Sequence, residues 1–123
     1  MLTQVHPVLP AADLDRLRGF YHDKLGLDPS EEHDGMLVYQ SSGGSFDVYE
    51  TENAGTAKNT QMVWMTDDLD AEMRRLRDTG VEFEEFEIPG MKTENGVVTT
   101  DEMKSAWFRD SEGNILCITQ DLR

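Results

Sequence analysis

The sequence has one cysteine, few basic residues and no long apolar stretch. A single cysteine, Cys117, excludes an internal disulfide and any zinc site that needs several thiolates. No apolar run approaches the roughly 20 residues that a membrane-spanning helix requires, so no membrane partner is expected. The first residues also lack the basic start and apolar core of a signal peptide. These absences predict a single cytoplasmic domain over residues 1–123.

The charge balance is strongly acidic. Lysine and arginine number 11 against 25 aspartates and glutamates, which gives a net charge of −14. A field of that sign repels phosphate backbones, so nucleic acid is not an expected partner. The excess of acid favours a cationic ligand or partner, or it simply keeps an exposed surface hydrated. The chain also has no Ser-His-Asp arrangement, phosphate-binding glycine loop or dinucleotide fingerprint, so those enzyme classes are not indicated.

An imperfect internal repeat organises the chain. The triplet Asp-Leu-Asp at residues 13–15 recurs at residues 68–70. In both places an extended run precedes the triplet, and an amphipathic helical pattern follows it and ends near a glycine. Asp13 and Asp68 are suited to cap these helices, because their carboxylates can accept from free backbone N–H groups.

The later strands of the two copies also correspond. A glycine turn and final strand at 42–50 match residues 112–120, and a further strand is expected before each turn. Neither half has enough apolar surface to be stable alone, so the two halves are expected either to share one core or to be exchanged between chains. The sequence predicts an α+β fold of two tandem βαβββ modules, module 1 at about 1–52 and module 2 at about 59–123.

The second copy is longer than the first, and the extra residues fall within 88–103. Glu94-Asn95-Gly96 indicates a tight turn between short extended arms. Such a long connection is either a functional flap or a surface hairpin, and the pattern leaves both open.

The segments that carry this repeat resemble the vicinal oxygen chelate superfamily, which includes glyoxalase I, bleomycin-resistance proteins and extradiol dioxygenases. In the first copy the resemblance lies in Gly19-Phe20-Tyr21 and Leu25-Gly26-Leu27. In the second it lies in the aromatic strand, acidic-glycine turn and last strand at 106–115. The resemblance implies two modules whose mixed sheets curl around one cleft, and a homodimer. These motifs are specific for a fold and not for one chemistry.

The resemblance also implies where metal ligands would lie, on the first and last strands of each module. The corresponding positions are His6, Gln61, Asp47 and Cys117. His6, Gln61 and Asp47 form a reduced ligand set for Zn²⁺, Ni²⁺ or Fe²⁺. Cys117 at the fourth position is expected to pack in the core instead. His6 as a hydrogen-bonded strand residue and Asp47 as a solvated carboxylate are the competing interpretations.

Two functions are therefore open, and no catalytic residue is assigned to either. The first is binding of a small cationic or aromatic compound, as in antibiotic resistance, by a surface with Trp107, Tyr49, Tyr39 and Arg109. The alternative is a divalent-metal-dependent lyase, isomerase or dioxygenase. Pro10 stands where glyoxalase I has an arginine for glutathione, which argues against that substrate. A third interpretation makes residues 88–103 a contact for a protein partner.

Overall fold

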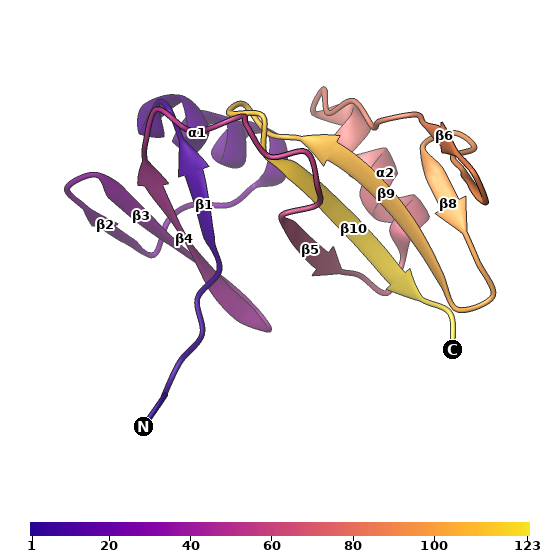
Figure 1. The fold of residues 1–123 in the computed structure, drawn as a ribbon, viewed down its shortest axis with the longest axis horizontal. Helices are drawn as coiled ribbons and strands as arrows, with labels where there is room; N and C mark the ends of the chain where they lie inside the picture. The colour runs from indigo at the N-terminus through magenta and orange to yellow at the C-terminus, as the bar shows by residue number, and fades with distance from the viewer. The chain divides into compact units, whose positions relative to one another are not determined.

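The computed structural model describes residues 1–123. They form two compact units, one of residues 1–57 with 110–114 and the other of residues 58–109 with 115–123. Each unit has one four-stranded mixed sheet and one main helix (Figure 1). The α+β fold class and the tandem βαβββ order are thereby confirmed. None of the helices has the length and apolar character that crossing a membrane requires.

Unit 1 begins with a strand, a helix and three further strands. The strand order is β1-β4-β3-β2, with β1 parallel to β4 and the other pairs antiparallel. The last strand of the module therefore lies between its first and third strands. The elements are β1 (Val8–Ala11), α1 (Leu14–Phe20), η1 (Tyr21–Leu25), β2 (Glu31–His33), β3 (Met36–Ser41) and β4 (Gly44–Glu50).

Unit 2 repeats this topology with insertions. The order β5-β10-β9-β8 again places the last strand between the first and the third, and β5 is parallel to β10. A separate hairpin of β6 and β7 precedes β8. The elements are β5 (Met62–Met65), α2 (Leu69–Asp78), β6 (Glu87–Ile88), β7 (Met91–Lys92), β8 (Val97–Thr99), β9 (Met103–Arg109) and β10 (Ile115–Asp121).

Both helices begin as the sequence predicts. The Asp13 carboxylate accepts from the backbone N–H of Arg16, and the Asp68 carboxylate accepts from that of Ala71. Each cap satisfies one of the free N–H groups in the first helical turn. The first helix then widens into the π-helical turn η1, which ends at Gly26 with a φ of 71°. A left-handed φ of this kind favours glycine.

Two local expectations meet different outcomes. The predicted turn at Glu94-Asn95-Gly96 is present, with φ of 53° at Asn95 and 81° at Gly96, and it joins the short β8 to the segment before it. The βαβββ order also requires a strand between the helix and β3, to which no residues were assigned; it is β2, an exposed strand made mostly of charged residues that ends at His33. Charged edge strands are common because they discourage pairing with other chains, and they carry little hydrophobic pattern for sequence reasoning.

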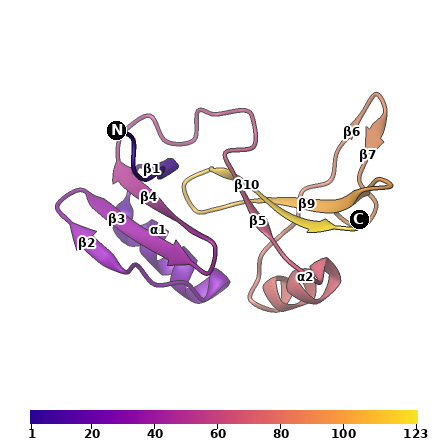
Figure 2. The ribbon, with the colours of Figure 1, turned by 90° about the horizontal axis from the view of Figure 1, so that it is seen from below.

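In each unit the helix lies on one side of its own sheet, and we call the opposite side the open face (Figure 2). Alternation along a strand decides which residues lie on which face. On β4, Phe46 and Val48 are buried on the helix side, whereas Asp47 and Tyr49 alternate with them on the open face. The open faces are the surfaces on which the predicted site residues can be compared.

Candidate functional site

The open face of unit 1 brings two predicted site residues together. His6 Nδ1 lies 3.1 Å from Asp47 Oδ1, and the two side chains are 31% and 18% exposed. The pairing arises because β1 runs parallel to β4 with Val8 opposite Asp47, which places the residue two before Val8 on the same face. The remaining ring nitrogen of His6 lies 3.1 Å from Gln4 Oε1. An imidazole and a carboxylate therefore meet at a surface that solvent reaches.

Tyr49 lies beside this pair on β4. It is 45% exposed, and its register partners are Pro10 on β1 and Met36 on β3. Because it follows Asp47 by two residues, its ring and the carboxylate share one face of the strand. This face combines an accessible aromatic ring with one half-buried acid.

Tyr39 was predicted to line the same surface, but it lies on the helix side. It is 1% exposed, its register partner is Phe46, and the two rings stack with centroids 5.1 Å apart. The Tyr21 ring centroid lies 5.2 Å from that of Tyr39 and 6.1 Å from that of Phe46, and burial raises the pKa of Tyr39 to about 12. The one-residue alternation of β3 decides this placement, so Tyr39 belongs to the core of unit 1.

Cys117 packs as the sequence analysis expects. It is 3% exposed on β10, between its register partners Trp107 and Val63. Its Sγ lies 3.4 Å from Thr119 Oγ1, which lies 2.8 Å from Ser105 Oγ. Burial raises the pKa of the thiol, so the charged thiolate that binds metals is disfavoured at this position.

Gln61 is engaged in backbone pairing at the start of β5. Its N–H donates to Ile115 O at 2.9 Å, and its side-chain Oε1 accepts from Ile115 N–H, also at 2.9 Å. The side chain thereby extends the ladder between β5 and β10 by one hydrogen bond. A metal at this position would have to compete with that backbone donor for the amide oxygen.

Trp107 and Arg109 lie on the open face of unit 2. The indole N–H of Trp107 donates to Thr60 Oγ1 at 3.0 Å, and the ring of Phe86 meets the indole edge to face at 5.3 Å. Arg109 Nε donates to Glu84 Oε1 at 3.0 Å in an exposed ion pair. The half-exposed indole is thus held at its edge, which leaves the ring in a fixed orientation.

The acidic-glycine turn between β9 and β10 is a structural centre that the site predictions missed. Glu112 has a fully buried side chain and accepts from the N–H groups of Ala12 and Asp13. It also binds the Arg16 guanidinium through both carboxylate oxygens, at 2.8 and 2.9 Å. These hydrogen bonds, led by the one from Arg16, lower the pKa of Glu112 to about 2.

Asp110 completes the same turn. One carboxylate oxygen accepts from the N–H groups of Glu112 and Asn114, and the other accepts from Tyr21 O–H at 2.8 Å. Asn114 donates from its side chain to Asp110 and to Pro10 O. Burial raises the pKa of Asp110, and the hydrogen bonds oppose that rise. The turn belongs to unit 1 although both of its strands belong to unit 2.

The residues at the four predicted ligand positions do not fit a complete metal site. His6 and Asp47 offer a nitrogen and a carboxylate, but the Gln61 oxygen accepts a backbone hydrogen bond and the Cys117 thiol is buried. Within either unit, no group of three or more His, Cys, Asp or Glu side chains is arranged to hold a metal ion. Structural and catalytic metal sites of the expected kind use at least three protein ligands.

Comparison with known proteins relates this geometry to one family. The family model described as the Glyoxalase/Bleomycin resistance protein/Dioxygenase superfamily matches residues 3–118. No curated protein sequence matches the chain.

Solved structures share the fold at low sequence identity. An integron cassette protein from the mobile metagenome of V. cholerae is 23% identical, with a TM-score of 0.63 over 98% of this chain and 95% of that chain. TnmS3, an antibiotic binding protein from Streptomyces sp., is 21% identical, with a TM-score of 0.63 over 98% of both chains. FosX, a fosfomycin resistance protein from Listeria monocytogenes complexed with Mn(II), is 14% identical, with a TM-score of 0.68 over 96% and 90%.

Proposed function

The chain belongs to the Glyoxalase/Bleomycin resistance protein/Dioxygenase superfamily, and on that basis we propose that it binds a small, flat, cationic organic compound without a metal ion. Members of the superfamily include fosfomycin resistance and antibiotic-binding proteins, so small-molecule binding is an established use of the fold. The ligand class and the metal independence are the parts that we add.

The observation that carries the proposal is the pairing of Asp47 with Tyr49 on the open face of unit 1. A carboxylate that is 18% exposed attracts a cation, and a ring that is 45% exposed offers its face for stacking or a cation–π contact. His6 contacts the Asp47 carboxylate at one oxygen and leaves the other available. The neighbouring Val8, 52% exposed, adds apolar contact area.

The indole of Trp107 is a second aromatic surface, and it lies on the open face of unit 2. Its hydrogen bond to Thr60 and its edge contact with Phe86 hold the ring in place before a ligand arrives. A preorganised ring loses less conformational entropy on binding than a mobile one. Either ring can stack on a planar ligand.

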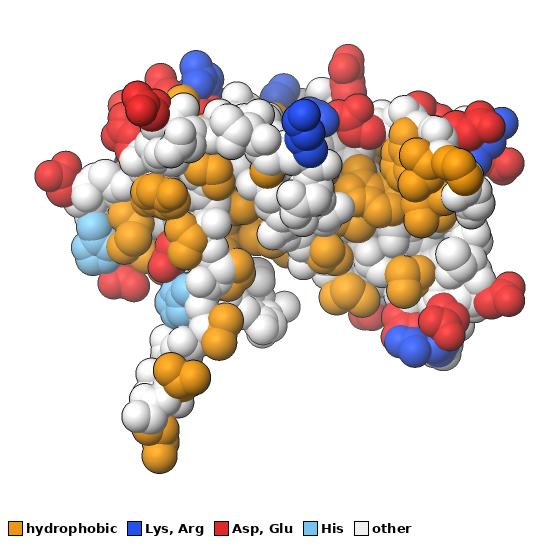
Figure 3. All heavy atoms as spheres, in the orientation of Figure 1, with side chains coloured by type: hydrophobic (Ala, Val, Ile, Leu, Met, Phe, Trp, Pro, Cys, Tyr) orange, Lys and Arg blue, Asp and Glu red, His pale blue; other side chains and the backbone are white.

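The negative net charge of the chain supports a positively charged ligand. Figure 3 shows acidic side chains mainly around the edge of the face that it draws, and the formal charge of the whole chain is −14. Such a field raises the local concentration of cations and speeds their association, more strongly at low ionic strength. The same field disfavours organic anions on the open faces.

Ethidium, a planar cation, is a suitable probe for this proposal. We expect saturable binding by isothermal titration calorimetry, which weakens as salt is raised. Asp47→Asn and Tyr49→Ala should each lower the affinity roughly fivefold, since each contact contributes about 1 kcal/mol. Titration with an anionic naphthalene sulfonate should give no binding on the open faces.

Glu50→Gln is the matched control, because Glu50 is an exposed acid on β4 that alternates away from Asp47 and Tyr49. It removes the same charge and should leave ethidium affinity within twofold of the parent chain. Equal losses in Asp47→Asn and Glu50→Gln would show that only net charge matters and would overturn the site.

A divalent-metal-dependent lyase, isomerase or dioxygenase is the second candidate. The 3.1 Å approach of His6 to Asp47 favours it, because both groups are common ligands of Zn²⁺ and Fe²⁺. Elemental analysis of protein purified without chelator distinguishes the two functions. One equivalent of metal that is lost in His6→Ala supports the enzyme, and a metal-free protein that still binds ethidium supports the first proposal.

Two organisational predictions accompany this function. The homodimer and the cytoplasmic location are the further expectations from the sequence. Light scattering on the purified protein measures its mass against 14.0 kDa per chain and tests the first of these.

A further inference from the structure

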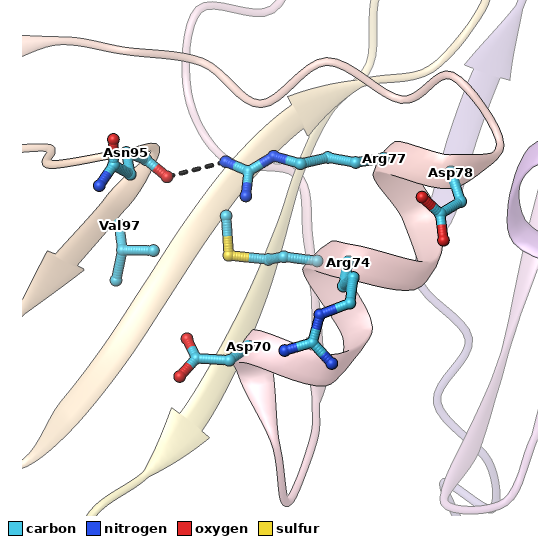
Figure 4. A pocket seen from close by; sticks show the side chains of 7 residues that line it. Asp70, Arg74, Arg77, Asp78, Asn95 and Val97 are labelled. Atoms are coloured by element: carbon cyan, nitrogen blue, oxygen red, sulfur yellow. Dashed lines mark hydrogen bonds between the residues drawn. The ribbon is translucent and has the colours of Figure 1, made fainter.

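A pocket of about 370 Å³ lies on the helix side of unit 2, opposite the open face of that unit. It opens between α2 and the segment at Asn95 and Val97 (Figure 4). Met73, buried in the core, contributes to its lining beside the half-buried Val97. The pocket therefore has an apolar part, and none of the four predicted ligand positions is among its lining residues.

The wall opposite the helix is held in place by close packing. A Cβ added at Gly96 would lie 3.1 Å from Phe83 Cβ and 3.4 Å from Met73 Cε, so the turn sits directly against these side chains. Arg77 Nη2 donates to Asn95 O at 2.8 Å, and its guanidinium lies 5.3 Å from the Phe83 ring centroid. Figure 4 shows this hydrogen bond crossing from α2 to the turn. The pocket is consequently preformed.

Arginines on α2 differ in how they are used. Arg75 forms an ion pair with Glu72 at 2.7 Å, one helical turn away. Arg74 lines the pocket and forms neither an ion pair nor a hydrogen bond, although the chain has more than two acids for every base. An unpaired guanidinium beside an apolar wall is a binding element for a planar anion, since its parallel N–H groups match a carboxylate.

Charges at the rim limit which anion fits. Asp70 and Asp78 also line the pocket, and Asp70 contacts the Lys104 ammonium at 3.5 Å in a weak, exposed pair. These two acids balance Arg74 and Arg77, so the lining carries no net charge. A phosphate dianion would meet repulsion from both carboxylates, whereas a monoanion can pair with Arg74 at lower cost.

We propose that this pocket is a second binding site, which takes a small organic monocarboxylate with an apolar group. The carboxylate pairs with Arg74, the free N–H groups of Arg77 add a second donor, and the apolar group contacts Met73 and Val97. The site is distinct from the open faces and has the opposite charge preference.

Benzoate is the test probe, followed on the intact chain by nuclear magnetic resonance of backbone amides and arginine Nε–H groups. We expect saturable shifts on α2 and at residues 94–97. Arg74→Gln should weaken benzoate about tenfold, the loss expected when one charge-assisted contact worth roughly 1.5 kcal/mol is removed. Arg75→Gln removes the same charge from the same helix and should leave the affinity within twofold.

Three results would overturn the proposal. They are an absence of saturable shifts on α2, equal weakening by Arg74→Gln and Arg75→Gln, and tighter binding of inorganic phosphate than of benzoate. Arg74 is exposed and makes no contact that folding depends on, so the variant should keep the parent's thermal stability. Ethidium binding to Arg74→Gln should be unchanged, which separates failure here from failure of the open-face site.

Discussion

The last hairpin of each module closes through a turn that contains glycine, at residues 42–43 in the first and at residues 110–114 in the second. The first turn is exposed, and Gly43 has nothing within 4 Å of an added Cβ. In the second turn Asp110, Glu112 and Asn114 are buried. Glu112 accepts from the backbone at the start of the first module's helix, Asp110 accepts from Tyr21 O–H in η1, and Asn114 donates to Pro10 O on β1. The two equivalent turns therefore differ in structural role, because only the second one is packed into a core.

Positions 47 and 117 differ in a similar way. Both lie on open faces of central last strands, yet Asp47 is partly exposed beside His6, whereas Cys117 is covered and surrounded by hydroxyl groups and apolar side chains. The two copies therefore share backbone positions, but the side chains at those positions have different roles. One copy of the last strand presents polar chemistry, and the other copy contributes packing.

Breaking the second turn should have the largest effect. Glu112→Ala removes a buried carboxylate and leaves two backbone N–H groups and Arg16 without their acceptor. We expect a loss of about 3–5 kcal/mol in the free energy of unfolding. Gly43→Ala in the first turn should change it by less than about 0.5 kcal/mol. Urea denaturation gives the free energy of unfolding of both variants. Similar losses in the two would contradict the difference in stabilisation between the two turns.

Acid should weaken the same turn. The pKa of Glu112 is about 2, below its ordinary 4.5, so its stabilisation is present above pH 4.5 and is lost as the pH falls towards 2. The shift corresponds to about 3 kcal/mol. The Glu112→Gln variant has no carboxyl group at this position. Its free energy of unfolding should therefore fall by about 3 kcal/mol less than that of the parent chain over the same pH range. The free energy of unfolding of both proteins is measured by urea denaturation between pH 5 and pH 2. An equal dependence on pH in the two proteins would contradict the stabilising role given to the Glu112 carboxylate.

Exchanging residues between the equivalent positions sharpens the second comparison. Cys117→Asp places a carboxyl group at a site that is 3% exposed and has no basic partner among its contacts, and it should cost about 2–3 kcal/mol. Asp47→Cys should cost less than about 1 kcal/mol, because that position is partly exposed. Thermal unfolding of both variants tests this. A smaller loss of stability in Cys117→Asp than in Asp47→Cys would contradict the assignment of position 117 to packing and position 47 to a polar surface.

Two tyrosines of unit 1 provide the smallest and best-matched test. Tyr21 O–H donates to Asp110 in the second turn, whereas the buried Tyr39 hydroxyl has no hydrogen-bond partner. Tyr21→Phe should therefore cost about 1–2 kcal/mol, and Tyr39→Phe should be neutral or slightly stabilising. Both substitutions remove one oxygen from a ring in the same core. If Tyr39→Phe proved the more harmful in urea denaturation, the role given to the Tyr21–Asp110 bond would be wrong.

The repeat allowed most of the fold to be predicted, because helix caps, glycine turns and apolar periodicity are local signals. The caps at Asp13 and Asp68 and the turn at Asn95-Gly96 were confirmed on that ground. Tyr39 was assigned to the wrong face of the sheet. A shift of one residue in strand register moves a side chain to the other face, and the register cannot be read from the sequence alone. The βαβββ order includes β2, but its residues were not located because three exposed polar residues carry no hydrophobic pattern.

The amino-acid sequence by itself determined the acidic surface, the duplicated α+β modules and the family, since composition and local patterns are enough to specify them. Only the tertiary structure decided that His6 meets Asp47, that Glu112 anchors the start of α1, and that Arg74 has no partner beside a preformed pocket. Each of these depends on which residues distant in the chain come into contact. That is a result of strand register and packing, which no short stretch of sequence encodes.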